Sequence, residues 1–231
     1  HHASSAASDV YKRQYYKFIY KMSNILIIGA NRGLGLEFVK QYSNTNHNII
    51  ATTRNKDSSN ELIEINNIDI AELDLTSDAS VNSFVTSIGS QKIDILIHNA
   101  GIFSDEQLKE DLDIDAWMNE MRINAVIPII LAQKLKNNLK TGSDKKVVFI
   151  SSQMGSIDDN YSGRFYFYRS SKSALNSAAR SLSIDWKEDG ISVLILHPGW
   201  VKTDMGGTSA KLEIPETVSY THLTLPTTHD V

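Results

Sequence analysis

The sequence contains no cysteine and only four prolines among its 231 residues. The lack of cysteine excludes a disulfide framework, a thiolate nucleophile and a cysteine-based metal site, and it fits a cytoplasmic location. No apolar stretch approaches the roughly 20 residues of a membrane-spanning helix, and a net charge of −4 argues against a nucleic-acid-binding surface. We therefore expect one domain with a full core, without a metal site and without a membrane or nucleic-acid partner.

Short apolar runs alternate with helical patterns along the chain. Continuous apolar runs are typical of strands buried on both faces, as in parallel sheets. The expected strands are 25–28, 48–53, 68–73, 93–97, 147–150 and 191–196, and the expected helices between them are 34–42, 77–88, 115–140 and 168–188. This alternation predicts an α/β fold: a Rossmann-like doubly wound parallel sheet flanked by helices.

Both ends of the chain carry strings that look like translated adapter DNA. Residues 9–14, Asp-Val-Tyr-Lys-Arg-Gln, can be encoded by a DNA string whose reverse complement encodes residues 218–223, Val-Ser-Tyr-Thr-His-Leu. The string looks like a transposon mosaic end, and free codon choice is the alternative explanation. We therefore expect a native domain at 22–217, starting at Met22, between non-native tails at 1–21 and 218–231. The two N-terminal histidines then form no metal site.

A glycine-rich turn follows the first expected strand. Gly29, Gly33 and Gly35 have the spacing Gly-x-x-x-Gly-x-Gly and open the first expected helix. Glycines let the backbone approach a pyrophosphate, and a helix N-terminus offers free N–H groups and a favourable dipole. A tight turn without a ligand is the alternative. In this context the turn indicates a dinucleotide site.

Three residues lie between Tyr168 and Lys172, so both side chains lie on one helical face. A phenol with a pKa of about 10 is a poor catalyst at neutral pH. A neighbouring ammonium lowers that pKa and makes the phenol a usable acid and base. Alone, such a pair is more typical of an ordinary helix surface than of a catalytic site.

Together these motifs resemble the short-chain dehydrogenase/reductase family over essentially all of residues 22–217. The string Pro-Gly-Trp-Val-Lys-Thr-Asp-Met-Gly-Gly at 198–207 resembles its C-factor/sniffer-like carbonyl reductase branch. His98 departs from the family's Asn-Asn-Ala-Gly, which leaves the principal role in that motif to Asn99. The family ends with a further helix and a seventh strand, so we expect this sheet to be truncated before its last strand.

The resemblance implies a role for each catalytic residue. Tyr168 would give the proton in carbonyl reduction and take it in alcohol oxidation, and Lys172 would lower its pKa and bind the nicotinamide ribose. Ser152 would hold the substrate oxygen, with Ser151 as its adjacent competitor. Asn124 would disturb the long helix and hold a water that leads from Lys172 to solvent. Its alternative role is to bond the backbone.

The resemblance also implies a cofactor site. Asp74 would bind the adenine, although the string Asp-Leu-Thr-Ser at 74–77 could merely cap the next helix. The segments 99–101 and 198–199 could each be a simple turn after a strand. The expected cofactor-binding set is Gly29, Asn31, Arg32, Gly33, Leu34, Gly35, Arg54, Asp74, Leu75, Asn99, Ala100, Gly101, Tyr168, Lys172, Pro198, Gly199, Val201 and Thr203.

The end of the second expected strand indicates which cofactor binds. An acidic residue there would accept a hydrogen bond from the ribose 2′-hydroxyl of NAD, whereas Arg54 offers a guanidinium for a 2′-phosphate. Arg32 adds a second cation within the glycine turn. Either arginine alone could be a solvated surface residue. Together they favour NADP(H) over NAD(H).

The expected activity is that of an NADP(H)-dependent oxidoreductase acting on a small carbonyl or alcohol substrate. The aromatic residues that flank the site line an apolar pocket, or instead pack the core or a dimer: Tyr161, Phe165, Tyr166, Phe167 and Trp200. Residues 204–212 occupy the family's mobile substrate loop. A homodimer or homotetramer stays open. The rival functions are an NADP-binding regulatory or signalling module and an inactive truncated fragment.

Overall fold

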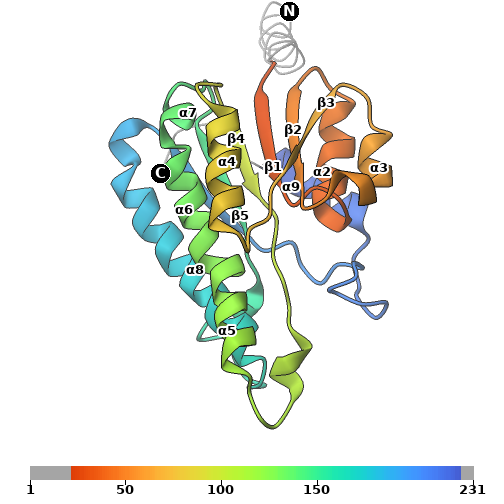
Figure 1. Ribbon diagram of the computed structural model, residues 1–231. Helices are drawn as coiled ribbons and strands as arrows, with labels where there is room; N and C mark the ends of the chain where they lie inside the picture. Colours follow the sequence, from red (N-terminus) through yellow and green to blue (C-terminus); the bar gives the residue numbers. More distant parts are fainter. Residues whose placement is uncertain (1–21, 225–231) are drawn as a thin grey trace, which may run out of the picture.

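The computed structural model describes residues 22–224, in which six parallel strands form one sheet in the order β3-β2-β1-β4-β5-β6 (Figure 1). The strands are β1 (Asn24–Ile28), β2 (Asn48–Thr53), β3 (Ile68–Glu72), β4 (Ile95–His98), β5 (Lys146–Ile150) and β6 (Ser192–Leu196). The chain winds from β1 outward to β3 and then returns to β4 on the other side of β1. This is the doubly wound parallel sheet that the sequence predicts.

Helices cover both faces of the sheet (Figure 1). One layer contains α2 (Gly33–Ser43), α3 (Asn60–Ile63) and α9 (Ile214–Thr224), and the other contains α4 (Asp78–Ile88), α6 (Ile127–Lys134) and α8 (Tyr166–Asp185). The remaining elements are α5 (Ile114–Met121), α7 (Lys136–Lys140), η1 (Lys56–Ser58), η2 (Asp105–Leu108), η3 (Arg122–Val126), η4 (Gln153–Gly155) and η5 (Lys187–Asp189). None of the helices in the described part is long and apolar enough to cross a membrane.

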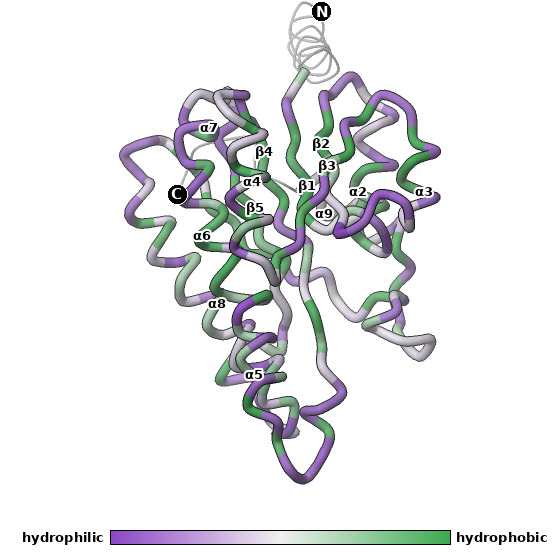
Figure 2. Tube along the Cα trace, viewed as in Figure 1, coloured by the Kyte–Doolittle hydropathy of each residue, from purple (hydrophilic) through white to green (hydrophobic). Residues whose placement is uncertain are grey.

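The sheet is apolar on both faces because side chains from its strands pack into two hydrophobic cores, one on each face. In β1, Leu26 and Ile28 pack into the cluster under α4, α6 and α8, whereas Ile25 and Ile27 pack into the cluster under α2. Figure 2 shows this hydrophobic centre between more hydrophilic outer helices. Burying each such side chain stabilises the fold by about 1.5–3 kcal/mol. An uninterrupted apolar run, rather than an alternating one, is what this position requires.

The expected single helix at 115–140 is wrong in detail. The chain forms α5, then one π-helical stretch, η3, then α6 and α7. The π-helical stretch is centred on Asn124, whose side chain bonds a neighbouring loop. A local disturbance at this residue is what the family resemblance implies.

Helix α9 crosses the expected boundary after Thr217. Val218 is 1% exposed and belongs to the same core cluster as the buried face of α2. Packing at this position differs from the expectation of an unpacked tail, although the origin of residues 218–231 stays a prediction. Residues 1–21 and 225–231 lie outside the described residues, and within 22–224 no seventh strand follows β6.

Candidate active site

The carboxyl ends of the six strands border a cleft of about 1500 Å³. Ligands of open α/β sheets bind where the strand order reverses, which here is between β1 and β4. Apart from Gly35 and Asn124, all of the predicted catalytic and cofactor-binding residues line this cleft. The fold therefore brings together segments that are distant in the sequence.

The glycine turn is held in place by its neighbours. Gly29 and Gly33 have positive φ angles, of 78° and 56°, which favour glycine. The Gly29 N–H donates to Thr52 Oγ1 at 3.1 Å, and Asn99 Nδ2 donates to the Gly29 carbonyl at 2.9 Å. A Cβ on Gly35 would lie 2.0 Å from that carbonyl. Gly35 therefore packs directly against the backbone of the turn and does not line the cleft.

The first turn of α2 faces this cleft and fits an anionic group. The residue before the helix, Arg32, makes no capping hydrogen bond with its side chain, so the first backbone N–H groups have no side-chain acceptor at that position. Gly33 and Leu34 line the cleft. Close backbone approach and a helix N-terminus are the features that a dinucleotide pyrophosphate needs.

Asp74 lies at the other side of the cleft. Its Oδ1 accepts hydrogen bonds from the Thr76 hydroxyl at 2.7 Å and from the Thr76 N–H at 2.9 Å, and these bonds lower its pKa. Ser77, and not Asp74, caps α4 by accepting from the Ser80 N–H. The string at 74–77 therefore does cap the helix, through Ser77, while Asp74 itself remains a cleft residue.

The two arginines differ in their surroundings. Arg32 Nη1 lies 2.6 Å from Asp204 Oδ2, and the two side chains are 64% and 75% exposed. This pair joins the glycine turn to the segment at 200–213. Arg54 is exposed, makes no ion pair in the part of the chain that is described, and its charge contributes to the lowered pKa of Asp74. Both arginines line the cleft.

Ser152, Tyr168 and Lys172 form a cluster at the ends of β5 and α8. Ser152 and Tyr168 both line the cleft, and the side chain of Ser152 favours the ionised form of Tyr168. Lys172 Nζ lies 5.6 Å from the centre of the Tyr168 ring and donates to the Ile150 carbonyl at 2.9 Å. Ser151 is buried and donates to Asn176 at 2.7 Å. The geometry therefore favours Ser152 over Ser151 as the hydroxyl that acts with Tyr168.

The pKa of Tyr168 is raised to about 12, mainly by burial and against the opposing effect of the Ser152 side chain. Burial also lowers the pKa of Lys172 to about 8. The net shift of the Tyr168 pKa is therefore upward, and a lowering contribution from Lys172 stays a prediction. The Lys172 ammonium lies over the Tyr168 ring and bonds a backbone carbonyl, while loss of solvation is the largest cause of the shift of the phenol.

Asn124 is buried behind the cleft. Its Nδ2 donates to the Ile102 carbonyl at 2.8 Å and to Ser171 Oγ at 3.0 Å, while its Oδ1 accepts from the Ile102 N–H at 2.8 Å. The alternative of bonding to backbone is therefore correct, with a distant loop as the partner instead of its own helix. A Cβ on Gly101 would lie 3.3 Å from Asn124 Oδ1 and 3.5 Å from Lys172 Nζ. The water relay stays a prediction.

The expected aromatic pocket is correct only in part. Phe165 and Trp200 line the cleft, whereas Tyr161 and Tyr166 are exposed outside it. Phe167 is buried and stacks on Trp117 at 5.0 Å.

The cleft also contains apolar residues that the sequence analysis did not single out. The Phe103 ring lies 5.3 Å from the Tyr168 ring, and Met154 and Met205 also line the cleft. Their proximity in sequence to Gly101, Ser152 and Asp204 is the signal that could have found them. His98 is buried against Phe149, which agrees with a packing role in the sheet.

Comparisons with known proteins agree with this geometry. The family model described as short chain dehydrogenase matches residues 23–213. The C-signal of Myxococcus xanthus is 38% identical over 138 residues, covering 60% of this chain and 83% of that protein. The structure of carbonyl reductase Sniffer of D. melanogaster matches with a TM-score of 0.82 and 34% identity, covering 89% and 92% of the two chains. The NADPH-bound carbonyl reductase from chicken fatty liver matches with a TM-score of 0.78 and 31% identity, covering 86% and 85%.

Proposed function

The chain belongs to the short-chain dehydrogenase family, and from that premise we propose that it is an NADP(H)-dependent carbonyl reductase or alcohol dehydrogenase. The observation that carries the proposal is the cluster of Ser152, Tyr168 and Lys172 in the same cleft as the glycine turn. The NADPH-bound relative supports the choice of cofactor. A homodimer or homotetramer and a cytoplasmic location stay predictions.

The residues of the cleft divide the work of binding the cofactor. The backbone at Gly33 and the start of α2 would hold the pyrophosphate. Arg54 would hold the 2′-phosphate, and Asp74 the adenine. Lys172 would bind the nicotinamide ribose, with Val201 and Thr203 beside the nicotinamide.

Tyr168 supplies the proton in reduction. When bound, the nicotinamide supplies the hydride. The Tyr168 hydroxyl gives its proton to the carbonyl oxygen of the substrate, and Ser152 holds that oxygen while negative charge develops on it. Lys172 stabilises the phenolate that remains. A phenol with a pKa of about 12 is protonated at neutral pH, which suits the reductive direction.

Turnover measurements test the proposal directly. Purified protein with NADPH is offered a panel of aldehydes and ketones, and loss of NADPH absorbance is followed. NADPH binding is measured in parallel by fluorescence titration. Binding of NADPH without turnover of any carbonyl would contradict the proposal and favour a regulatory module. The similarity to the protein named C-signal is the observation behind that alternative.

We expect Ser152→Ala to lower kcat by about 10²-fold, because it removes a hydroxyl that stabilises developing charge. Ser151→Ala is the matched control: it removes the bond to Asn176 and should lower stability by about 1 kcal/mol with little change in kcat. Steady-state kinetics and thermal melts of both variants check this. Equal loss of kcat in the two would show that Ser152 has no special role.

We expect Arg54→Asp to weaken NADPH binding by about 10-fold to 100-fold, because it replaces a charge-assisted hydrogen bond with repulsion. NADH binding should change little, so the preference is abolished or reversed. Arg180→Asp makes the same charge change on the exposed surface of α8 and is the control. Fluorescence titration with both cofactors measures the ratio, and an unchanged ratio in Arg54→Asp would exclude the phosphate contact.

A further inference from the structure

Glu120 is a buried carboxyl beside the candidate active site. It lies in α5, one turn before Asn124, and its side chain is 0% exposed. Its Oε2 accepts from the Ser104 N–H at 2.9 Å, whereas its buried Oε1 has no hydrogen-bond partner within residues 22–224. Acidic side chains are almost never fully buried unless they are paired. The burial of the Glu120 carboxyl therefore indicates a role other than packing.

A chain of hydrogen bonds leads from Glu120 to Tyr168. The carbonyl of Ser104 accepts from Gln107 Nε2 at 2.7 Å, and Gln107 Oε1 accepts from the backbone N–H of Tyr168 at 3.2 Å. Gln107 is itself buried. Glu120 therefore anchors the turn that holds the backbone of Tyr168.

Helix α8 depends on this contact because its own start is poorly capped. The residue before the helix, Phe165, has a φ of 54° and makes no capping hydrogen bond with its side chain. The preceding residue, Arg164, has a φ of 58°, and such left-handed conformations are strained outside glycine. The first N–H groups of a helix have no partner within it. Gln107 supplies the acceptor that the local sequence lacks.

Glu120 also acts on Lys172 through its charge. Lys172 is buried, donates to the Ile150 carbonyl, and has no ion-pair partner within residues 22–224. The negative charge of Glu120 favours the protonated form of Lys172 and so opposes the lowering of its pKa by burial. Burial raises the pKa of Glu120 itself to about 7, against the Ser104 hydrogen bond and the charge of Lys172.

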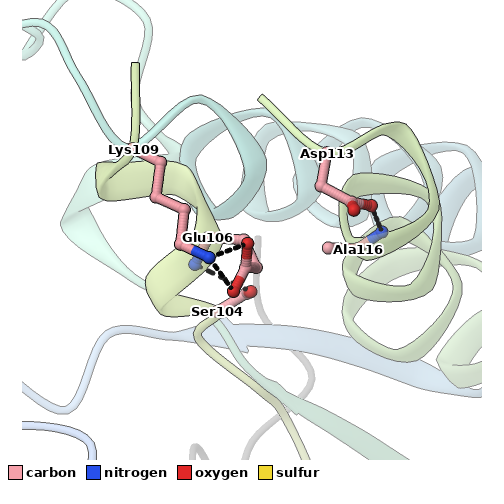
Figure 3. A network of polar contacts seen from close by, with 5 residues as sticks. All are labelled: Ser104, Glu106, Lys109, Asp113 and Ala116. Carbon is pink, nitrogen blue, oxygen red and sulfur yellow. Dashed lines mark hydrogen bonds and ion pairs between the residues drawn. The ribbon is translucent and has the colours of Figure 1, made fainter. Parts of the chain in front are cut away.

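The other charged groups around Glu120 have partners, are exposed to solvent or are neutral. Glu106 pairs with Lys109, and Asp113 accepts from the Ala116 N–H at the start of α5 (Figure 3). On the neighbouring elements, burial lowers the pKa of His98 to about 3 and raises that of Tyr168, so both are neutral. The remaining groups face other partners: Arg122 pairs with Asp78, Arg169 donates to Ser162, and Asp115 is exposed.

We infer that Glu120 is a positioning residue for the proposed reaction: it anchors the turn that caps α8 at Tyr168, and its carboxylate acts electrostatically on the buried ammonium of Lys172. The inference rests on the proposed function only for its kinetic consequence. Carbonyl reduction needs Lys172 protonated, so loss of the Glu120 charge should make activity fall at a lower pH. Two separate substitutions distinguish the charge from the anchor.

Glu120→Gln tests the charge, because the amide oxygen can still accept from the Ser104 N–H. The alkaline limb of the kcat–pH profile should move down by about one pH unit, with the melting temperature close to that of the parent. Asp115→Asn removes an exposed charge from the same helix and should leave the profile unchanged. An unmoved limb in Glu120→Gln would overturn the inference.

Gln107→Leu tests the anchor, because it removes the acceptor for the Tyr168 N–H without changing any charge. We expect kcat to fall by about 10-fold, in line with the large effect of a small misplacement of catalytic groups, while the alkaline limb stays in place. Retention of full kcat by this variant would overturn the anchoring role.

A direct titration of Lys172 keeps the test independent of turnover. The ¹³Cε signals of the lysines are followed by NMR as the pH is raised, and the signal missing from Lys172→Met identifies Lys172. Its pKa should be lower in Glu120→Gln than in the parent, and an equal pKa would overturn the inference. If the parent lacks carbonyl reductase activity, the proposed function fails while this titration still decides the role of Glu120.

Discussion

Tyr168→Phe is expected to lower kcat for carbonyl reduction by at least about 10²-fold, the loss typical of removing acid-base catalysis. NADPH affinity should change little. Phenylalanine keeps the ring that packs on Phe103 and lies under Lys172 Nζ, so the change is confined to the hydroxyl. Steady-state kinetics with NADPH in excess, together with fluorescence titration of the cofactor, measure the two quantities.

The same helix offers a matched control for this experiment. Tyr166 lies two residues before Tyr168 at the start of α8, but its side chain is exposed and lies outside the cleft. Tyr166→Phe should therefore leave kcat at the parental value. Parental activity in Tyr168→Phe would show that another group supplies the proton.

Lys172→Met is expected to change activity and stability in opposite directions. It removes the charge that stabilises the Tyr168 phenolate and a predicted ribose contact, so kcat should fall by at least about 10²-fold and NADPH should bind more weakly. Yet burial lowers the pKa of Lys172 from 10.5 to about 8. That shift corresponds to about 3 kcal/mol against the charged form in the folded state.

The sign of the stability effect follows from proton binding. Below pH 8 the lysine is charged in both states, and the folded state carries the full penalty. Between pH 8 and 10.5 the unfolded state binds more protons, so the parent gains stability as the pH rises. Lys172→Met lacks the penalty, and we expect its melting temperature at pH 7 to exceed that of the parent by a few degrees.

Thermal melts across this pH range check the expectation. The difference between the variant and the parent should shrink as the pH rises from 7 towards 10. Lys134→Met, at an exposed position in α6, should show no such trend. A variant that melts below the parent at pH 7 would mean that the hydrogen bond to the Ile150 carbonyl outweighs the burial penalty.

The strands could be predicted from the sequence because their signal is local. Residues such as Ile25 and Ile27 face one core while Leu26 and Ile28 face the other. The run therefore has to be continuous, and its limits are visible in the sequence. The glycine turn and the spacing of Tyr168 and Lys172 are local in the same sense. Most residues of the candidate site could be predicted from such short strings, and the parallel fold brings the strings together at the carboxyl ends of the strands.

The remaining features depend on contacts between distant segments. The π-helical stretch forms where Asn124 bonds Ile102, and no local pattern in the helix encodes that loop. Glu120 lies in an amphipathic segment in which an acidic residue is normally exposed, and the loop carrying Ser104 is what buries it. The raised pKa of Tyr168 likewise reflects how deeply the fold buries the phenol, a quantity that spacing does not contain.

The parallel direction of all six strands has a practical consequence for use of the protein as a biocatalyst. The carboxyl end of every strand points towards the cleft. The chain therefore enters β1 at the amino ends of the strands, on the side of the sheet away from the cleft (Figure 1). Met22 is 58% exposed at that entry. Immobilisation on a solid support through this end would leave the mouth of the cleft turned towards the bulk solution, so that cofactor and substrate can diffuse in and out.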